Sequence, residues 1–546
     1  MNNLYLIKIT ANQAAGNQID IQKPIAISFF GVTQDVLDGK KNMTINICHR
    51  SDLTTFEQIE IQGATNVRFS SKLNSFLAAN GDQMGADDLL VVEKVGRSYS
   101  VWLIKKETAN YAVLEELFDK GEKHMLLTAD FGDLSTDNED LIDKHSSILT
   151  ALRTKPFVLL AGISGTGKSR LVKELAFMTC PKDWVDANTG VVESLSEDPT
   201  TPFNYCLIEV KPNWHDSSEL LGYYNALDEK YELTSFIRFA YRAAQYPEIP
   251  FFVCLDEMNL APVEQYFAEY LSVLETRTLT DKGIVSAPLL KADLFNGISA
   301  EKYAAVPEDK AVFEYIADNG LQLPSNLYII GTVNMDDTTH QFSRKVIDRA
   351  FTIEMNGGNL RDMFEEKNAN TLQYRDDILP LEAIKSCFVS ANEVFKDLHI
   401  AKYEKEIKEK VPAHLEAINL ILKDTPFQVS YRVQNELILY LTYLIEQAGF
   451  PDDIDSLIGD ATLAILLQKI LPRVQGDDKL LGKGDKNDVF TELREYVEKN
   501  FVQKEQPQED GQVKELVKGS SLYKQVIDKL DQMHKRLENS YFANFF

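Results

Sequence analysis

Short runs of alternating apolar and polar residues dominate the first 107 positions of the chain. The clearest runs are Asn3–Ile9, Ile25–Phe30, Leu89–Val92 and, after the turn residues Gly96 and Arg97, Ser98–Ile104. A period of two places successive side chains on opposite faces of a strand, and the Gly, Asn and Asp residues between the runs favour turns. The pattern predicts a small β-rich domain over residues 1–110.

Residues 111–140 are expected to connect this domain to the rest of the chain. A helical pattern over Tyr111–Asp119 is followed by Ala129–Asp140, a segment rich in Asp, Gly, Ser and Thr. Clusters of small polar residues between patterned segments are typical of linkers.

From residue 141 to residue 356 the pattern changes to continuous apolar runs that alternate with helical segments. The expected strands are Phe157–Ala161, Tyr205–Val210, Phe251–Leu255, Leu327–Gly331 and Ala350–Glu354. Strands that are apolar on both faces belong to a parallel sheet covered by helices on both sides, which predicts an α/β core with five parallel strands. Residues 276–325 lack a clean period and are expected to form an insertion at the edge of the sheet.

Beyond residue 356 the pattern is helical, with charged amphipathic stretches such as Ala401–Lys410 and Gln434–Gln447. Residues 357–500 are therefore expected to form a helical lid on the core. The hydrophilic segment Lys504–Gly511 interrupts the pattern, and Ser520–Asn539 is expected to be a final helix that packs on the lid, so residues 501–546 form a C-terminal linker and helix.

Charge narrows the possible partners. The 546 residues include 57 basic and 83 acidic side chains, for a net charge of −26. Such a chain repels phosphate over most of its surface, so any contact with DNA must come from a local patch. Residues 1–110 hold 11 basic and 11 acidic side chains, which makes this neutral part the better candidate for facing DNA.

The five cysteines are scattered, without a CxxC pair or clustered histidines. This argues against structural zinc and against a disulfide framework, and it fits a reducing, cytoplasmic environment. The N-terminal sequence lacks a basic flank followed by an apolar run, and no stretch approaches 18 uninterrupted apolar residues. We therefore expect neither a signal peptide nor a membrane span.

The segment GISGTGKS at residues 162–169 fits the pattern GxxxxGK[ST] in full. It follows the expected strand FVLLA and opens a helical segment, which is the context that a phosphate-binding P-loop requires. In such a loop, glycines let successive N–H groups point at phosphates, and the helix adds the positive end of its dipole. The expected nucleotide-binding residues are Gly162, Ser164, Gly165, Thr166, Gly167, Lys168, Ser169 and Arg170. Lys168 is expected to reach the β- and γ-phosphates, and the Ser169 hydroxyl to ligate magnesium.

Two carboxylates end the next buried strand. Asp256 is placed to hold the magnesium shell, and Glu257 to polarise the attacking water. An acidic pair at the end of a strand is common by itself, but downstream of a P-loop it favours nucleotide hydrolysis.

Two further groups complete the expected site. Asn334 ends the strand YIIGTVN, where its amide is placed to hold the water or the γ-phosphate, and Asp337 lies three residues later. Arg344 and Arg349 precede the fifth strand, and either guanidinium is a candidate to reach the γ-phosphate of a neighbouring subunit. Arg349 is the favoured candidate, and an ordinary surface salt bridge is an even alternative for each arginine.

The stretch from about 145 to 475 resembles the McrB family, the AAA+ motor subunits of restriction systems that act on modified DNA. The resemblance is carried by GISGTGKS, by VKPNWHDSSELLGYY at residues 210–224, by LDEMNLAPVEQYFAEYLSVLE and GTVNMDD, and by SYRVQNELILYL and QKILPRVQG in the lid. It implies a hexameric ring with nucleotide between subunits, and a separate McrC-like nuclease as partner. It also implies the use of GTP, which the family associates with an Asn-x-x-Asp signature that Asn334 and Asp337 match. Because residues 335, 336 and 338 depart from the family form, ATP stays open as the substrate.

In this family the N-terminal domain varies and reads DNA. Residues 68–106 are similar to the DNA-binding pseudobarrel of plant transcription factors and some restriction enzymes. On that basis Phe69, Tyr99 and Trp102 are candidates for a pocket that takes a flipped base, and basic residues are candidates for phosphate contacts, namely Arg68, Lys72, Arg97, Lys105 and Lys106. Ordinary core aromatics and solvated basic residues are the alternative.

Three other functions compete with this hypothesis. A chaperone-like remodeller similar to MoxR proteins would act on protein partners without DNA, and a nucleotide-gated sensor would signal by ring formation. Asp198 with Glu209 and Lys211 echoes a metal-dependent nuclease, but Glu209 falls within the second strand of the expected parallel sheet, where a nuclease site has no room.

Overall fold

The computed structural model describes residues 4–14, 18–30, 32, 34–37, 39–49, 52–63, 66–80, 83–95, 98–106, 123–127, 136–185, 192–281, 283–334, 342–355, 372–375, 378–379, 381–482, 487–501 and 521–545. The chain forms two compact units, one of Met1–Thr136 with Glu446–Phe450 and one of Asp137–Ile445 with Pro451–Phe546. Each unit has its own apolar core.

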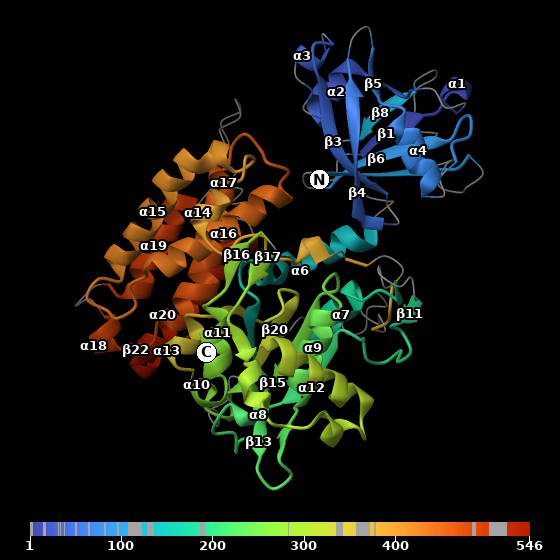
Figure 1. Ribbon diagram of the computed structural model, residues 1–546. Coiled ribbons are helices and arrows are strands. Elements are labelled where there is room, and N and C mark those ends of the chain that lie inside the picture. The colour runs from blue at the N-terminus through green and yellow to red at the C-terminus, as the bar shows by residue number, and fades with distance from the viewer. Residues whose placement is uncertain are drawn as a thin grey trace, which may run out of the picture. The chain divides into compact units, whose positions relative to one another are not determined.

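The N-terminal unit is built on one eight-stranded sheet (Figure 1). Its elements are β1 (Leu4–Lys8), α1 (Ala11–Ala14), β2 (Asp20–Ile21), α2 (Lys23–Phe30), α3 (Gln34–Leu37), β3 (Asn42–His49), β4 (Asp52–Gln62), β5 (Val67–Phe69), α4 (Lys72–Ala79), β6 (Leu89–Val95), β7 (Ser98–Ile104) and β8 (His124–Leu127). The strand order is β2-β5-β4-β3-β7-β6-β1-β8, and the β3–β7 pair is parallel while the other pairs are antiparallel.

The strand expected at Ile25–Phe30 is wrong, because these residues belong to helix α2. The buried side chains there are Ile25, Ala26, Phe29 and Phe30. Residues one, four and five positions after Ile25 lie on the same face of a helix as Ile25, whereas in a strand every second residue would share a face. The apolar run was therefore read with the wrong period.

The second unit begins with an α/β core. Its elements are α6 (Thr136–Thr154), β9 (Phe157–Gly162), α7 (Lys168–Thr179), β10 (Asp183–Val185), β11 (Val192–Ser194), β12 (Tyr205–Glu209), α8 (Ser218–Leu221), β13 (Tyr223–Asn225), β14 (Lys230–Glu232), α9 (Ser235–Gln245), β15 (Phe251–Asp256), η1 (Met258–Leu260), α10 (Val263–Tyr266), α11 (Ala268–Leu274), β16 (Thr278–Thr280), β17 (Gly283–Val285), β18 (Pro288–Leu290), η2 (Ala292–Phe295), η3 (Ala300–Tyr303), α12 (Pro307–Asn319), β19 (Leu321–Gln322), β20 (Leu327–Asn334), α13 (Arg344–Ile347) and β21 (Phe351–Glu354).

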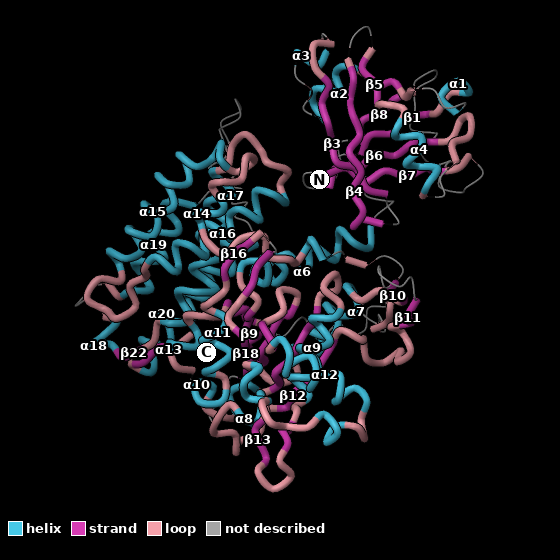
Figure 2. The backbone as a smooth tube through the Cα atoms, viewed as in Figure 1, coloured by secondary structure: helices cyan, strands magenta, loops and turns pink. Residues whose placement is uncertain are grey.

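Five parallel strands form the sheet of this core, in the order β12-β15-β20-β9-β21. Figure 2 shows β9 and β12 of this sheet in magenta among the cyan helices of the same unit. The prediction of an α/β core with five parallel strands is confirmed. Successive residues of β9, β15 and β20 are buried on both faces of the sheet. Burial on both faces explains why these strands are continuous apolar runs rather than alternating ones. Strand β9 lies between β20 and β21, so the loop that follows β9 opens beside the ends of its neighbours.

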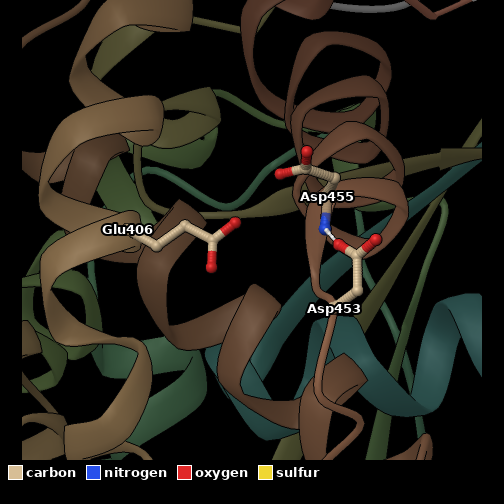
Figure 3. Close-up of side chains that lie close together, drawn as sticks. All are labelled: Glu406, Asp453 and Asp455. Atoms are coloured by element: carbon tan, nitrogen blue, oxygen red, sulfur yellow. Dashed lines mark hydrogen bonds between the residues drawn. The ribbon is translucent and has the colours of Figure 1, made fainter.

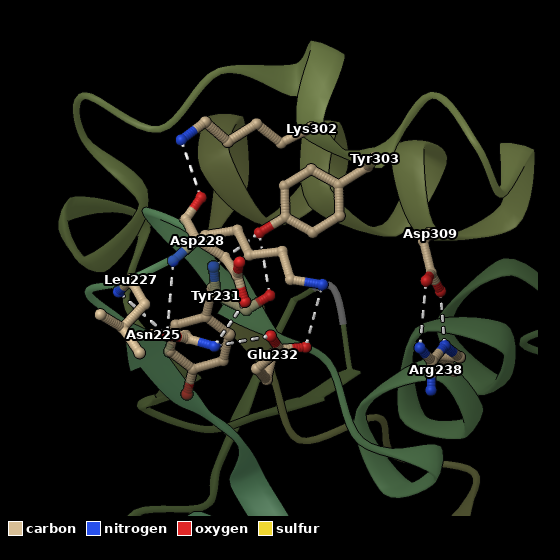
Figure 4. A network of polar contacts seen from close by, with 10 residues as sticks. Asn225, Leu227, Asp228, Tyr231, Glu232, Arg238, Lys302, Tyr303 and Asp309 are labelled. Carbon is tan, nitrogen blue, oxygen red and sulfur yellow. Dashed lines mark hydrogen bonds and ion pairs between the residues drawn. The ribbon is translucent and has the colours of Figure 1, made fainter.

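Residues 276–325 contain the β16–β17 hairpin and a second antiparallel pair, β18–β19, whose strands are separated in sequence by the 3-10 turns η2 and η3 and by α12. Helix α12 packs against α9, which in turn contacts the edge strand β12. A polar network also binds this insertion to the β13–β14 hairpin (Figure 4). The Tyr303 hydroxyl accepts a hydrogen bond from Tyr231 N (2.8 Å) and donates one to Tyr231 O (2.9 Å). At the far end of the network, Arg238 makes a two-pronged ion pair with Asp309.

The C-terminal part of the second unit is helical. Its elements are η6 (Leu381–Ala383), α14 (Ala391–Val394), η7 (Ala401–Tyr403), α15 (Glu404–Ile421), α16 (Tyr431–Gln447), α17 (Asp455–Ile465), the π-helical turn η8 (Leu466–Ile470), η9 (Leu471–Arg473), β22 (Gly476–Asp477), α18 (Asp478–Leu481), α19 (Val489–Phe501), α20 (Ser521–Ser540) and β23 (Phe542–Ala543). The last helix, α20, packs on α17 and α19. The buried ammonium of Lys529 on this helix lies 2.8 Å from the carboxylate of Glu354 at the end of β21, so α20 also joins the core.

Among the described residues, no helix combines the length and the apolar character that a bilayer crossing demands. All five cysteines lie among the described residues, and none of them forms a disulfide there.

Candidate active site

The GISGTGKS segment forms a loop between β9 and α7. Gly165 and Gly167 have φ angles of 84° and 83°, and a Cβ atom at either position would meet nothing within 4 Å. Glycine is therefore required at these two positions by backbone conformation and not by space. Gly162 is required for another reason, since a Cβ there would lie 2.4 Å from Met355 O on the chain that follows β21.

Lys168 is the first residue of α7, and its side chain is buried. Its ammonium donates to the carbonyl oxygens of Gly162 (3.0 Å) and Ile163 (2.8 Å) at the start of the loop. The long side chain thus folds back over the loop instead of pointing into solvent. A cation enclosed by a loop at the N-terminus of a twelve-residue helix makes a site suited to anions.

The next residue of α7 reaches the neighbouring strand. The Ser169 hydroxyl donates to Asp256 Oδ1 at 2.5 Å, and Asp256 is the last residue of β15. Cys254, two residues earlier on β15, is buried. Its burial, together with the charge of Asp256, raises the pKa of its thiol to about 12, so this cysteine stays a neutral thiol.

Glu257 follows Asp256 directly and turns the chain away from the sheet. Its φ and ψ angles of 52° and 48° lie in the left-handed region, which is rare for a residue other than glycine, Asn or Asp. Its carboxylate accepts a hydrogen bond from the Asn334 side chain at 3.0 Å. Asn334 ends β20, and its ladder partner is Gly162 at the start of the P-loop.

The expected residues therefore converge at the carboxyl ends of three adjacent strands, β15, β20 and β9. Lys168, Ser169, Asp256, Glu257 and Asn334 are brought together there, and the loop residues Ser164, Thr166 and Arg170 lie on or beside the same loop. In open parallel sheets this edge is the usual place for a ligand. Asp337 lies outside the described residues.

A magnesium ion fits the donor set. The Ser169 hydroxyl and the Asp256 carboxylate are hard oxygen ligands, which Mg²⁺ prefers, and they lie within 2.5 Å of each other beside the enclosed ammonium of Lys168. Magnesium in proteins is characteristically held by one or two such groups and by phosphate oxygens of the substrate.

Two residues that the sequence did not single out lie in the same group. Thr332 on β20 donates to Asp256 Oδ1 (2.8 Å) and accepts from Glu257 N (2.9 Å). Asn259 donates to Asn334 O at 3.1 Å. Alternate residues of a strand share a face, so the assignment of Asn334 to the site implied that Thr332 faces it too.

The two arginines expected to act across a subunit boundary lie against other groups in this chain. The guanidinium of Arg344 stacks on the ring of Phe427, 4.6 Å from its centre. Arg349 lies 3.6 Å from Glu275 at the end of α11, and Arg432 from the helical region lies 3.0 Å from the other oxygen of Glu275. Arg432 therefore links the helical region to the core by a salt bridge.

Glu275 is the one exposed member of an ionic cluster whose other members are buried. The four residues, called the buried ionic cluster below, are Lys155, Glu275, Glu436 and Lys469. The ammonium of Lys155 lies 3.0 Å from both Glu275 and Glu436, and Lys469 lies 3.0 Å from Glu436. Burial alone would raise the pKa of each carboxyl, but the neighbouring cations outweigh it and hold both pKa values below the ordinary range. Both carboxylates are therefore ionised at neutral pH.

A second acidic group, Glu406, Asp453 and Asp455, has the proximity of a metal site (Figure 3). Lys410 forms ion pairs with Glu406 and Asp455, and Asp453 accepts the Asp455 backbone N–H at 2.9 Å. The Lys410 ammonium and the turn hydrogen bond explain why these carboxylates lie close together, so their proximity does not require a metal ion.

In the N-terminal unit, Phe69 and Tyr99 are buried in the apolar core, where both pack on Phe30. These two residues are therefore ordinary core aromatics, which was the alternative to a pocket for a flipped base. Lys105 and Lys106 form ion pairs with Asp88 and Asp87. Arg97 lies outside the described residues.

A family model described as a domain of unknown function (DUF8727) matches residues 382–542, which span most of the helical region and α20. No curated protein matches the chain. Among solved structures, the chain is similar to one described as a "putative ATPase" from Cytophaga hutchinsonii ATCC 33406, with 15% sequence identity and a TM-score of 0.30 over 58% of this chain and 80% of that chain.

The fold is assigned from the structure of this chain itself. A P-loop joins the strand β9 to α7, beside the acidic end of β15 in a five-stranded parallel sheet, and a helical region follows the sheet. The chain has a P-loop ATPase-like fold with a β-rich N-terminal unit.

Proposed function

We propose that this chain is a magnesium-dependent nucleoside triphosphatase of the AAA+ type that hydrolyses GTP or ATP. One observation carries the proposal. A continuous chain of hydrogen bonds runs from Ser169 on α7 through Asp256 and Thr332 to Glu257, and from Glu257 to Asn334, beside the enclosed Lys168. An anion-binding loop, a metal-binding pair and a carboxylate placed to act as a base are the parts that phosphoryl transfer to water requires.

Each residue has a distinct role in this proposal. The Lys168 ammonium and the loop N–H groups bind the phosphates, and Ser169 with Asp256 holds magnesium, which neutralises charge on the phosphate oxygens when bound. Glu257 accepts a proton from the attacking water, and the Asn334 amide holds the Glu257 carboxylate in position.

Substitution of Lys168 tests the binding half of the proposal. In Lys168→Ala the loop loses its only buried cation among the described residues of the site, so we expect nucleotide to bind at least about ten-fold more weakly, the equivalent of one charge-assisted hydrogen bond. Binding of a fluorescent GTP or ATP analogue with magnesium measures the change. Lys291→Ala, the same substitution at an exposed lysine outside the loop, is the control and should bind as the wild type does within about two-fold. A full-length protein that binds neither purine triphosphate would end the proposal.

We propose further that the chain works as a ring, with hexamers as the expected form, in which Arg349 or Arg344 approaches the nucleotide of the next subunit. Support comes from the position of both arginines directly before β21 and from the resemblance to McrB-type motors. In this proposal the N-terminal domain recognises DNA, and the ring drives or activates a separate McrC-like nuclease against modified or foreign DNA.

DNA binding by the full-length protein tests the finer part. We expect binding that weakens steeply with salt, because phosphate contacts release counterions. Lys72 is exposed at the start of α4, and Lys72→Ala should lower the slope of log K against log salt by about 1. Lys105→Ala is the matched control, since Lys105 is already paired with Asp88 at 2.9 Å, and its slope should equal that of the wild type. Fluorescence anisotropy with modified and unmodified duplexes over a salt series provides the measurement. Absence of salt-dependent binding to either duplex would contradict DNA recognition and favour a remodeller of protein partners.

A further inference from the structure

We infer that Thr332 is a positioning residue for hydrolysis, whose hydroxyl fixes both carboxylates of the site. The inference rests on the proposed function. The Thr332 hydroxyl lies between Asp256 Oδ1, at 2.8 Å, and the backbone nitrogen of Glu257, at 2.9 Å. It is the group that joins the metal-binding carboxylate to the backbone of the proposed base.

The strand register places Thr332 where it can make both contacts. Strands β15 and β20 are parallel, with Leu255 opposite Gly331, so the next residues, Asp256 and Thr332, are side by side. Thr332 is 1% exposed, and its other neighbour in the ladder is Leu160 on β9. The side chain is thus fixed by the two strands that flank β20.

The direction of both hydrogen bonds is determined by chemistry. The Glu257 N–H can only donate, so the Thr332 oxygen accepts from it, and the single Thr332 proton goes to the Asp256 oxygen. A hydroxyl can satisfy both groups at once, whereas the isosteric Val side chain can satisfy neither. Asp256 Oδ1 also accepts from Ser169, so the Thr332 bond sets which side of this oxygen is left for other ligands.

The contact matters most for Glu257, because its backbone is strained. A left-handed conformation at a glutamate persists only where the surroundings enforce it. Glu257 lies just beyond the last residue of β15, and its N–H donates to the hydroxyl of Thr332 within the sheet. The same turn brings the Glu257 carboxylate to the amide of Asn334. Loss of the Thr332 hydroxyl therefore removes a contact that holds the turn at Glu257, and with it the position of the Glu257 carboxylate.

The experiment compares three variants of the full-length protein in steady-state hydrolysis with GTP and ATP. In Thr332→Val we expect kcat to fall by about ten-fold or more, since small displacements of a catalytic group have effects of this size, while the Kd of a non-hydrolysable nucleotide analogue changes by less than about two-fold. Thr332→Ser keeps the hydroxyl and loses only a methyl group, and it should retain turnover within about three-fold of the wild type.

Thr352→Val is the matched control. Thr352 is also 1% exposed, lies on β21 of the same sheet with β9 between it and β20, and its hydroxyl has no hydrogen-bond partner among the described residues. It should turn over as the wild type does. Equal turnover in Thr332→Val and Thr352→Val would overturn the inference, and so would equal losses in Thr332→Val and Thr332→Ser, which would assign the effect to the methyl group. A wild-type protein that binds nucleotide but never hydrolyses it would instead contradict the proposed function.

Discussion

The Glu257→Gln variant is expected to bind nucleotide normally and to lose hydrolysis by about 10² -fold or more, the usual contribution of a positioned general base. Glutamine has the shape of glutamate and keeps an oxygen that can accept the hydrogen bond from Asn334, made at 3.0 Å in the wild type. The strained turn and the contacts of Asp256 therefore stay in place. What disappears is the basic carboxylate, so binding and chemistry are separated in one substitution.

Two measurements on the full-length protein check this expectation, release of phosphate from GTP and ATP, and binding of the same nucleotides with magnesium. Glu264→Gln is the control, because Glu264 is an exposed residue of α10 seven positions later and loses the same charge. It should hydrolyse nucleotide at the rate of the wild type. A Glu257→Gln protein that turns over as fast as Glu264→Gln would remove Glu257 from the mechanism.

The sequence was sufficient for those parts of the fold in which local pattern and final burial agree. Strands β9, β15 and β20 are buried on both faces, and each appears in the sequence as an uninterrupted apolar run between helical segments. The GISGTGKS motif also carries its own conformational requirement, because Gly165 and Gly167 adopt positive φ angles. Such features depend on a few neighbouring residues and are visible without the fold.

Helix α2 shows where this reasoning fails. Its sequence, KPIAISFF, has no helix-forming polar face, and the run of β-branched and aromatic residues resembles a strand. The segment is helical because Ile25, Ala26, Phe29 and Phe30 all pack into the N-terminal core. Tertiary packing therefore overrides a local preference that is worth only tenths of a kilocalorie per residue.

The contacts that orient the site were invisible for a different reason. Thr332 lies 76 residues from Asp256, and only the register of β15 with β20 brings them together. The residues of the buried ionic cluster are likewise far apart in the sequence. Lys155 and Glu436 are 281 residues apart, and no spacing in the sequence marks either residue as buried. A charged residue is normally read as a surface residue, so these positions could not be recognised before the fold was known.

Removal of one acidic partner from the buried ionic cluster should have the largest effect on stability. Glu436 is 3% exposed and receives the ammonium groups of both Lys155 and Lys469. In Glu436→Gln these ammonium groups stay in the interior with less compensation, which typically costs roughly 3–5 kcal/mol in the free energy of unfolding. For a unit of about 400 residues, this corresponds to a fall of roughly 5 °C in the melting temperature. Calorimetry and urea denaturation measure both quantities.

The dependence of stability on pH provides a second test of the role of Glu436. The pKa of Glu436 is held below its ordinary value by the two ammonium groups, in spite of burial. Its contribution is therefore fully present above the ordinary glutamate pKa, and it is lost as the pH falls through the lowered value. Wild-type stability should decline more steeply in that acidic range than the stability of Glu436→Gln.

The cause of this loss can be separated from the loss of packing. Glu314→Gln removes the same charge from an exposed ion pair with Lys310 on α12, and it should change stability by less than about 1 kcal/mol. Lys469 also donates to the carbonyl oxygens of Asp348 and Ala350, just before β21, so its charge is tied to the core strand as well as to Glu436. The double variant Glu436→Gln with Lys469→Met removes the stranded ammonium and should recover part of the lost stability. If Glu436→Gln were no less stable than Glu314→Gln, the cluster would not hold the helical region to the core through charge, and apolar packing alone would have to account for that junction.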